Sequence, residues 1–267
     1  NDVLYTTSME QAFALYDAMG MRTTGTLAHS PTGLKGKGLN EFLDAETRSL
    51  DYTYESRKLL SPNTAFRVRA NPDADWGFGV DSAQADIDFT KQKGEFRLLN
   101  KDQYFSLTAN KYIAYMDFAL WQIPKKAIDL SKESGAGLSE MISVHPHQDS
   151  LRFLADHSKF YLENTLLESF KVPEIIVADA YIYPDTGYVA IDSNAAMRTL
   201  TNAAVSADLV DQYHNIYGAS IDIKSANYYH GKGDYEYVDK DGTPWPIHFK
   251  ELKVDTGTTV GFAQVSQ

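Results

Sequence analysis

The sequence has no cysteine and no long apolar run. Without cysteine the chain forms no disulfide, carries no thiol nucleophile and builds no zinc site on thiolates. No window approaches the roughly 18 uninterrupted apolar residues of a membrane helix, so no transmembrane segment is predicted. The first three residues, Asn1 to Val3, lack the basic and apolar regions of a signal peptide. We therefore expect a mature form or a piece cut from a longer chain.

Basic residues are also scarce. Lys and Arg number 25 against 36 Asp and Glu, which gives a formal net charge of −11. A protein that binds the phosphate backbone needs a basic surface, so nucleic acid is not an expected partner. Binding to an anionic membrane face is disfavoured for the same electrostatic reason.

Aromatic residues are abundant, with 17 Tyr and 13 Phe, and this enrichment is typical of strands. From Thr23 onwards, turn-forming residues recur about every ten residues, as expected for short antiparallel strands. Segments long enough to be the crossover helices of a parallel α/β sheet are missing. We predict an all-β fold of stacked short antiparallel strands, in the form of an elongated jelly roll, a β-solenoid-like stack or a sandwich.

One segment, Ser8–Met19, predicts a short helix at the N-terminus. Ser8 is a suitable cap, and Phe13, Leu15 and Met19 roughly share one helical face. The rest of the chain divides at a small, polar, glycine-containing stretch that resembles a linker. The predicted organisation is an N-terminal extension (1–20), a first β segment (21–130), the linker (131–140) and a second β segment (141–267). The alternative is one continuous β stack.

The stretch SVHPHQDSLRF, residues 143–153, has the composition of a metal site. A strand projects alternate side chains to one side, so His145, His147 and Asp149 would converge there. Two imidazoles and a carboxylate suit zinc, iron or another transition metal. However, Pro146 fixes φ and removes a ladder donor, and Asp, Ser and Pro are common turn formers. The favoured interpretation is a turn leading into a strand, and the three-residue metal site is the alternative.

Other motifs give little chemistry. Arg67 and Arg69 share a face of a predicted strand and would bind a carboxylate, although two exposed arginines are the simpler interpretation. Gly36 and Gly38 match no phosphate-binding motif and instead predict a bulge or close strand packing. The motifs G-x-S-x-G and S-x-x-K with its companion motifs are missing. No catalytic residue and no cofactor is predicted, and an enzymatic role is left open without being favoured.

Several stretches occur in a characteristic order, among them GTLAHSPTGLKGKG, NKYIAYMDFALW, ISVHPHQDSLRF, VADAYIYPDTG and GDYEYVD. Together they resemble a segment of the very long, β-rich, uncharacterised cell-envelope proteins of Bacteroidota, from about Thr23 to Thr256. The resemblance implies an exported protein of the periplasm or cell surface and an excerpt of a larger chain. Members of that family carry an acidic residue where this chain has His147, which weakens a metal role for His147. A further architectural resemblance is to the jelly rolls of lipopolysaccharide-transport proteins.

These features favour a non-enzymatic structural or interaction segment of a large exported envelope protein. The expected partners are other envelope proteins or the rest of its own longer chain. One alternative is a lipid- or lipopolysaccharide-binding β jelly roll. Another is a carbohydrate-binding protein or a β-helix polysaccharide lyase, in which Arg67 and Arg69 would face an acidic sugar.

Overall fold

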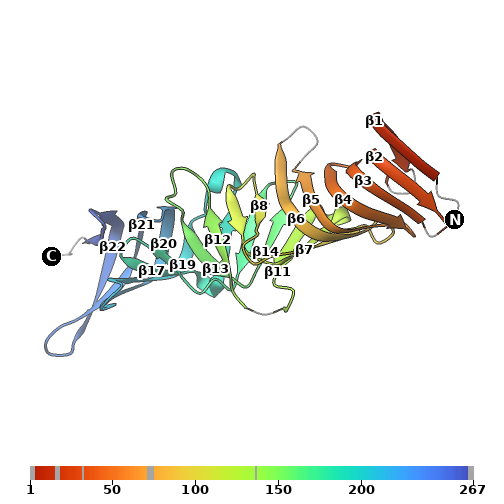
Figure 1. Cartoon of the computed structure of the whole chain (residues 1–267). Coiled ribbons are helices and arrows are strands. Elements are labelled where there is room, and N and C mark those ends of the chain that lie inside the picture. The colour runs from red at the N-terminus through yellow and green to blue at the C-terminus, as the bar shows by residue number, and fades with distance from the viewer. Residues whose placement is uncertain (1–3, 16–18, 32, 71–74, 136, 264–267) are drawn as a thin grey trace. The chain divides into compact units, whose positions relative to one another are not determined.

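The computed structural model describes residues 4–15, 19–31, 33–70, 75–135 and 137–263; the side chains of 4, 5, 7–11 and 15 are not described. Strands make up 66% of the chain, and the described residues contain no helix of seven residues or more. The only helical elements in these ranges are three 3-10 turns, η1 (Ile123–Lys125), η2 (Asp185–Gly187) and η3 (Ser193–Ala195). The predicted all-β fold of stacked antiparallel strands is confirmed (Figure 1).

The chain forms two compact units, which are described separately below. Unit 1 comprises Asn1–Ala109, Ile113–Gly137 and Lys159–Leu166, and unit 2 comprises Asn110–Tyr112, Leu138–Ser158 and Leu167–Gln267. The units are not consecutive in sequence, because the chain returns to unit 1 after first entering unit 2. The predicted linker spans the end of a unit 1 strand at Ser131 and the start of a unit 2 strand at Ser139.

Unit 1 is built on an antiparallel meander. The pairing runs from β1 through β7 and then continues to β10 and β11, with β8 bridged to β6. Its strands are β1 (Leu4–Leu15), β2 (Met21–Ser30), β3 (Gly33–Phe42), β4 (Ala45–Glu55), β5 (Lys58–Arg69), β6 (Trp76–Asp88), β7 (Lys93–Leu98), β8 (Phe105–Leu107), β10 (Phe118–Gln122) and β11 (Ala127–Ser131). Two further strands, β9 (Tyr112–Ala114) and β14 (His157–Tyr161), have residues in both units, as does β15 (Leu166–Phe170), which is described with unit 2.

The helix predicted for Ser8–Met19 is wrong. Residues up to Leu15 belong to β1, which pairs antiparallel with β2 in registers that include Thr6↔Leu27 and Ala14↔Arg22. The irregularity between Ser8 and Phe13 interrupts the two-residue period, so the apolar spacing there imitates a helix. The neighbouring strand supplies backbone partners that outweigh the weak local helix signal. Residues 16–18 of the predicted helix lie outside the described residues.

The core of unit 1 is a cluster of aromatic rings around Phe66. The Phe66 side chain is fully buried, and its ring stacks on Phe96 at a centroid distance of 4.1 Å. The rings of Trp121 and Phe78 lie 5.3 Å and 6.4 Å away. Because these residues come from β5, β6, β7 and β10, the cluster joins four strands through side-chain packing.

A row of buried polar side chains crosses β2, β3, β4 and β5 of unit 1. Thr23 Oγ1 donates to Asn40 Oδ1 at 2.7 Å, and Asn40 Nδ2 donates to Thr47 Oγ1 at 3.3 Å. Ser49 Oγ continues the row by donating to Thr64 Oγ1 at 2.8 Å. Cross-strand hydroxyl and amide pairs of this kind satisfy one another, so their burial carries little penalty.

The predicted close packing at Gly38 is confirmed. Gly38 lies opposite Gly25 in the β2–β3 ladder, and both have positive φ, at +139° and +142°. A Cβ atom at Gly38 would lie 2.1 Å from the carbonyl oxygen of Thr24. Only glycine permits this approach of the two backbones. Gly36 lies under the ring of Tyr52 and is followed by an irregularity in the β3–β4 register.

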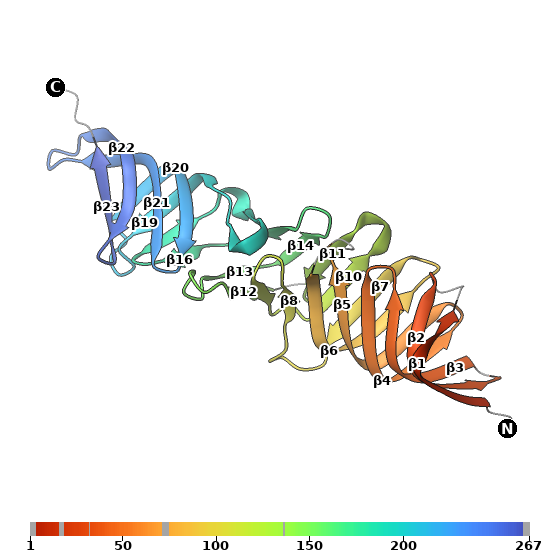
Figure 2. The same cartoon turned by 90° about the horizontal axis from the view of Figure 1, so that it is seen from above.

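Unit 2 contains one long antiparallel series and a separate pair of strands. The series runs β12-β13-β16-β17-β19-β20-β21-β22-β23, and its strands β19 to β23 can be followed in Figure 2. In addition, β15 pairs with β18. Its strands are β12 (Ser139–Ser143), β13 (Arg152–Ala155), β15 (Leu166–Phe170), β16 (Ile175–Val177), β17 (Ala180–Tyr183), β18 (Val189–Ile191), β19 (Leu200–Ala207), β20 (His214–Ser225), β21 (Tyr228–Val238), β22 (Pro244–Asp255) and β23 (Thr258–Ala263).

We expect Phe66→Ala to destabilise unit 1 by about 3–5 kcal/mol, because the substitution removes a fully buried ring and leaves a cavity. Urea unfolding followed by intrinsic fluorescence measures this loss, since Trp121 packs against Phe66. Leu50→Ala, at a side chain that is 75% exposed in β4, is the control and should change stability by about 0.5 kcal/mol or less. Equal effects of the two substitutions would contradict the central role of the ring cluster.

Candidate binding surfaces

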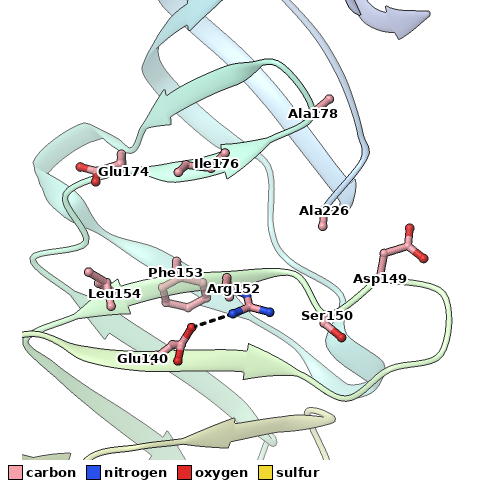
Figure 3. A pocket seen from close by; sticks show the side chains of 10 residues that line it. All are labelled: Glu140, Asp149, Ser150, Arg152, Phe153, Leu154, Glu174, Ile176, Ala178 and Ala226. Carbon is pink, nitrogen blue, oxygen red and sulfur yellow. Dashed lines mark hydrogen bonds and ion pairs between the residues drawn. The ribbon is translucent and has the colours of Figure 1, made fainter. Parts of the chain in front are cut away.

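A groove on unit 2 lies over β12, β13 and β16. β13 pairs with β12 over the length of the strand, but it pairs with β16 only at Phe153↔Ile175. Ala226 closes one end of the groove. Its backbone N–H donates to the carbonyl of Gln148, and its carbonyl accepts from the backbone N–H of Ala178. The space between has a volume of about 560 Å³ (Figure 3), which is within the range of small-ligand sites.

Strand alternation gives this groove its lining. Met141, Phe153 and Ile175 point into the core and are almost fully buried. Their sequence neighbours point outwards, and two of these are apolar. Leu154 is 40% exposed and Ile176 is 49% exposed, and Figure 3 shows them on neighbouring strands. An apolar pair on the solvent side of a sheet is unusual where alternation predicts polar residues.

The rim of the groove is mostly acidic. Arg152 Nη1 donates to Glu140 Oε1 at 3.3 Å across β12 and β13. Asp149 Oδ2 accepts from Asn227 Nδ2 at 3.2 Å at the opposite end of the groove. Among the described residues, the Glu174 carboxylate has no hydrogen-bond or ion-pair partner. The groove therefore combines an apolar floor with one carboxylate that is free to bind a cation.

The stretch that suggested a metal site forms a turn over residues 146–150, in agreement with the favoured interpretation. The rings of His145 and His147 lie 5.6 Å apart, and the backbone N–H of His147 donates to His145 Nδ1 at 3.2 Å. The Asp149 carboxylate instead bonds to Asn227. In the part of the chain that the structure describes, no three His, Asp or Glu side chains come together in a way that could hold a metal ion.

The structural anchor of this turn is Gln148, which lies between His147 and Asp149 in the sequence. Gln148 is buried, with only 6% of its surface exposed. Gln148 Nε2 donates to the carbonyl of Ala195 at 2.7 Å, and the backbone carbonyl of Gln148 accepts from Leu151 and Ala226. Nothing in the local sequence distinguished this glutamine as the buried residue of the stretch.

Arg67 and Arg69, the predicted carboxylate-binding pair, lie on the same face of β5 in unit 1. Arg67 Nη2 is 3.5 Å from the exposed carboxylate of Asp81. The Arg69 guanidinium lies over the ring of Trp76, 4.1 Å from its centroid. The two cations therefore have different partners, a carboxylate and an aromatic ring.

A second surface of unit 2 is an aromatic face on the β21–β22 hairpin. Figure 1 shows this hairpin reaching past the neighbouring strands of the unit. Cross-strand pairing places Tyr237 opposite Trp245 and Tyr235 opposite Ile247 on one side, with Phe249 next to them. The rings of Tyr235 and Phe249 lie 6.0 Å apart. We call the five residues Tyr235, Tyr237, Trp245, Ile247 and Phe249 the aromatic face.

The aromatic face continues the core layer of unit 2. Tyr235 lies opposite Ile216, which is 4% exposed, and Leu252 on β22 is 1% exposed. Exposure then rises along the hairpin to 50% for Tyr237 and 56% for Trp245. A hollow of about 180 Å³ lies where the face meets the core. The inner side of the sheet is thus covered at one end and open at the other.

The Trp245 ring is held in place by Asp239. Trp245 Nε1 donates to Asp239 Oδ2 at 3.0 Å, and the backbone N–H groups of Asp241 and Thr243 donate to Asp239 Oδ1 at 2.9 Å. The indole N–H and these backbone donors lower the pKa of the Asp239 carboxyl. The same carboxylate closes the turn at Gly242, whose φ is +80°.

Comparison with known proteins gives no relative, so the class of this protein is described by its fold and its surfaces. No protein-family model, curated protein or solved structure matches the chain. No helix in the described ranges has the length and apolar character needed to cross a membrane. The chain is an all-β protein with an apolar groove and an open aromatic face on unit 2.

We expect the hairpin turn to loosen in acid. Because the folded pKa of Asp239 lies below its unfolded value, the carboxylate stabilises the turn above about pH 4 and this contribution is lost as pH falls through the lowered pKa. The measurement is an NMR titration of the Trp245 indole N–H and the amides of Asp241 and Thr243 between pH 7 and pH 2. Asp239→Asn should abolish the shared titration, and an unchanged titration would contradict the assignment.

Proposed function

We propose that the chain is a non-enzymatic interaction segment of a large exported cell-envelope protein, and that the aromatic face is where a partner protein docks. The single observation that carries the proposal is the exposure of Tyr237 and Trp245 on the same side of the sheet as the core. Soluble proteins rarely leave contiguous apolar surface open unless something binds there. Tyr and Trp are also the residues that contribute most to binding energy at protein interfaces.

The geometry of the face suits a preformed interface. The hydrogen bond from Trp245 to Asp239 fixes the indole before any partner arrives, which lowers the entropy lost on binding. The pair Tyr237↔Trp245 also stabilises its own hairpin through cross-strand contact. A partner that places apolar side chains on this face would extend the core layer that ends near Leu252.

Two further features support a scaffold in preference to the alternatives. The rings of Phe66, Phe96 and Trp121 fill the interior of unit 1 where a lipid-carrying jelly roll would need an open trough. Arg67 and Arg69 bind different groups, whereas a lyase would need them to face one acidic sugar. The envelope location rests on the ordered stretches that resemble the Bacteroidota proteins.

The test is site-specific photocrosslinking in the envelope of the producing cell. A benzophenone amino acid at Tyr237 should give one discrete protein adduct, because this side chain would be covered by the partner. Trp245→Ser in the same chain should reduce the adduct by more than about tenfold, since hot-spot residues at interfaces contribute ~2 kcal/mol or more and ~1.4 kcal/mol is already tenfold in affinity.

The control position is Val210, which lies in unit 2 and is 86% exposed. A crosslinker at Val210 should give no matching adduct. Equal labelling from both positions, or labelling of glycan or lipid alone from Tyr237, would contradict a protein-docking role.

A further inference from the structure

We propose that the groove over β12, β13 and β16 receives a lysine side chain from a segment of a partner protein. The proposal concerns a different surface from the aromatic face and does not depend on the envelope location. It is based on three properties of the groove: its shape, its apolar floor and the charge of its rim.

The shape comes from the sheet itself. β13 and β16 are adjacent but pair at one position, so a space of about 560 Å³ opens beside that pair. Asp149 and Ser150 both adopt positive φ, at +51° and +56°, where the chain turns into β13. Backbone bonds through Ala226 hold the end of the groove near these residues. The groove is therefore built by the fold and does not depend on a side-chain rotamer.

The floor suits an aliphatic stem. Leu154 and Ile176 remain 40% and 49% exposed, and they lie diagonally across β13 and β16 on the solvent face (Figure 3). Covering them removes apolar surface from water, which favours binding of a methylene chain. Lysine carries four methylenes that pack on apolar surface while its charged end stays at the edge.

The rim suits a single positive charge. The groove is lined by three carboxylates, those of Glu140, Asp149 and Glu174, and by one cation, Arg152. Arg152 is already paired with Glu140. Glu174 lies next to Ile176 at one end of the groove and has no partner among the described residues. The free carboxylate attracts a cation, and lysine covers more of the apolar floor than arginine does, because its stem has four methylenes and that of arginine has three. The net charge of −11 attracts a basic partner over a longer range.

The experiment is an NMR titration of the full chain, labelled at isoleucine and leucine methyl groups. The probe is the acetylated, amidated peptide Ala-Leu-Lys-Leu-Ala. We expect saturable shifts at the methyl groups of Ile176 and Leu154. A peptide with norleucine in place of lysine keeps the stem and loses the ammonium, and it should bind about 3- to 5-fold more weakly, as for a partly exposed ion pair.

Two substitutions test the roles of the rim charges. Glu174→Gln should weaken binding of the lysine peptide by about 3- to 5-fold and leave the norleucine peptide unaffected. Arg152→Gln should strengthen binding, because it removes the competing cation and releases Glu140. Glu236→Gln, an exposed acid in unit 2 on β21, removes the same charge elsewhere and is the matched control. All three positions are solvent-accessible, so the spectra of folded variants remain comparable.

Three results would overturn the proposal. The first is equal binding of the lysine and norleucine peptides. The second is an equal loss of affinity in Glu174→Gln and Glu236→Gln. The third is binding of free butylamine as tightly as the peptide, which would assign the groove to a small amine and not to a partner protein. None of these results affects crosslinking at Tyr237, so the two proposals fail separately.

Discussion

Antiparallel pairing with one buried face is the constraint on which the rest of this structure depends. Every strand in a ladder must direct alternate side chains inwards, and a slip of one residue would exchange the two sides. In β13 the alternation Arg152, Phe153, Leu154, Ala155 meets this requirement, with Phe153 and Ala155 buried. This alternation continues through both the groove and the aromatic face. At the groove, however, apolar residues stand where polar ones are expected, and at the aromatic face the covering layer ends.

The two surfaces depart from the rule in different ways. At the groove, apolar side chains occupy the solvent side, at Leu154 and Ile176. On the hairpin, Tyr237 and Trp245 occupy the core side, but no described layer covers them. The first departure concerns residue type, and the second concerns the extent of the opposing layer. Functional surfaces are often found where local rules are broken in this manner.

Strand-forming composition and turn spacing were sufficient to predict the fold class, because both are local properties. The Asp241-Gly242 pair is a local turn signal of the same kind, and the chain turns there. Lys93-Gly94 has the composition of a turn, but both residues lie in β7. The chain turns earlier, where Asp88 Oδ1 accepts from the N–H groups of Thr90 and Lys91. The residue at position 94 of β7 is glycine because a Cβ atom there would lie 3.1 Å from the ring of Phe96. A glycine that makes room for a ring resembles a turn glycine when only the sequence is known.

The candidate sites were less accessible to sequence reasoning. The groove depends on Phe153 meeting Ile175 across 21 intervening residues, and no local pattern encodes that distance. The alternation of Tyr235 and Tyr237 with Trp245 and Ile247 was visible, but it does not say whether another layer covers the face. The sequence suggested His145 and His147 as the residues of interest in this stretch, whereas the buried anchor of the turn is Gln148.

The polar row through Thr23, Asn40 and Thr47 has a consequence for how unit 1 reaches its final arrangement. A shift of two residues between strands would keep every apolar side chain inside, and so hydrophobic burial alone would tolerate it. The same shift would separate Asn40 from both hydroxyl partners and leave its amide buried without hydrogen bonds, at a cost of about 1–3 kcal/mol for each lost group. The polar row thus favours the native strand register over registers shifted by two residues, which hydrophobic burial alone would not distinguish.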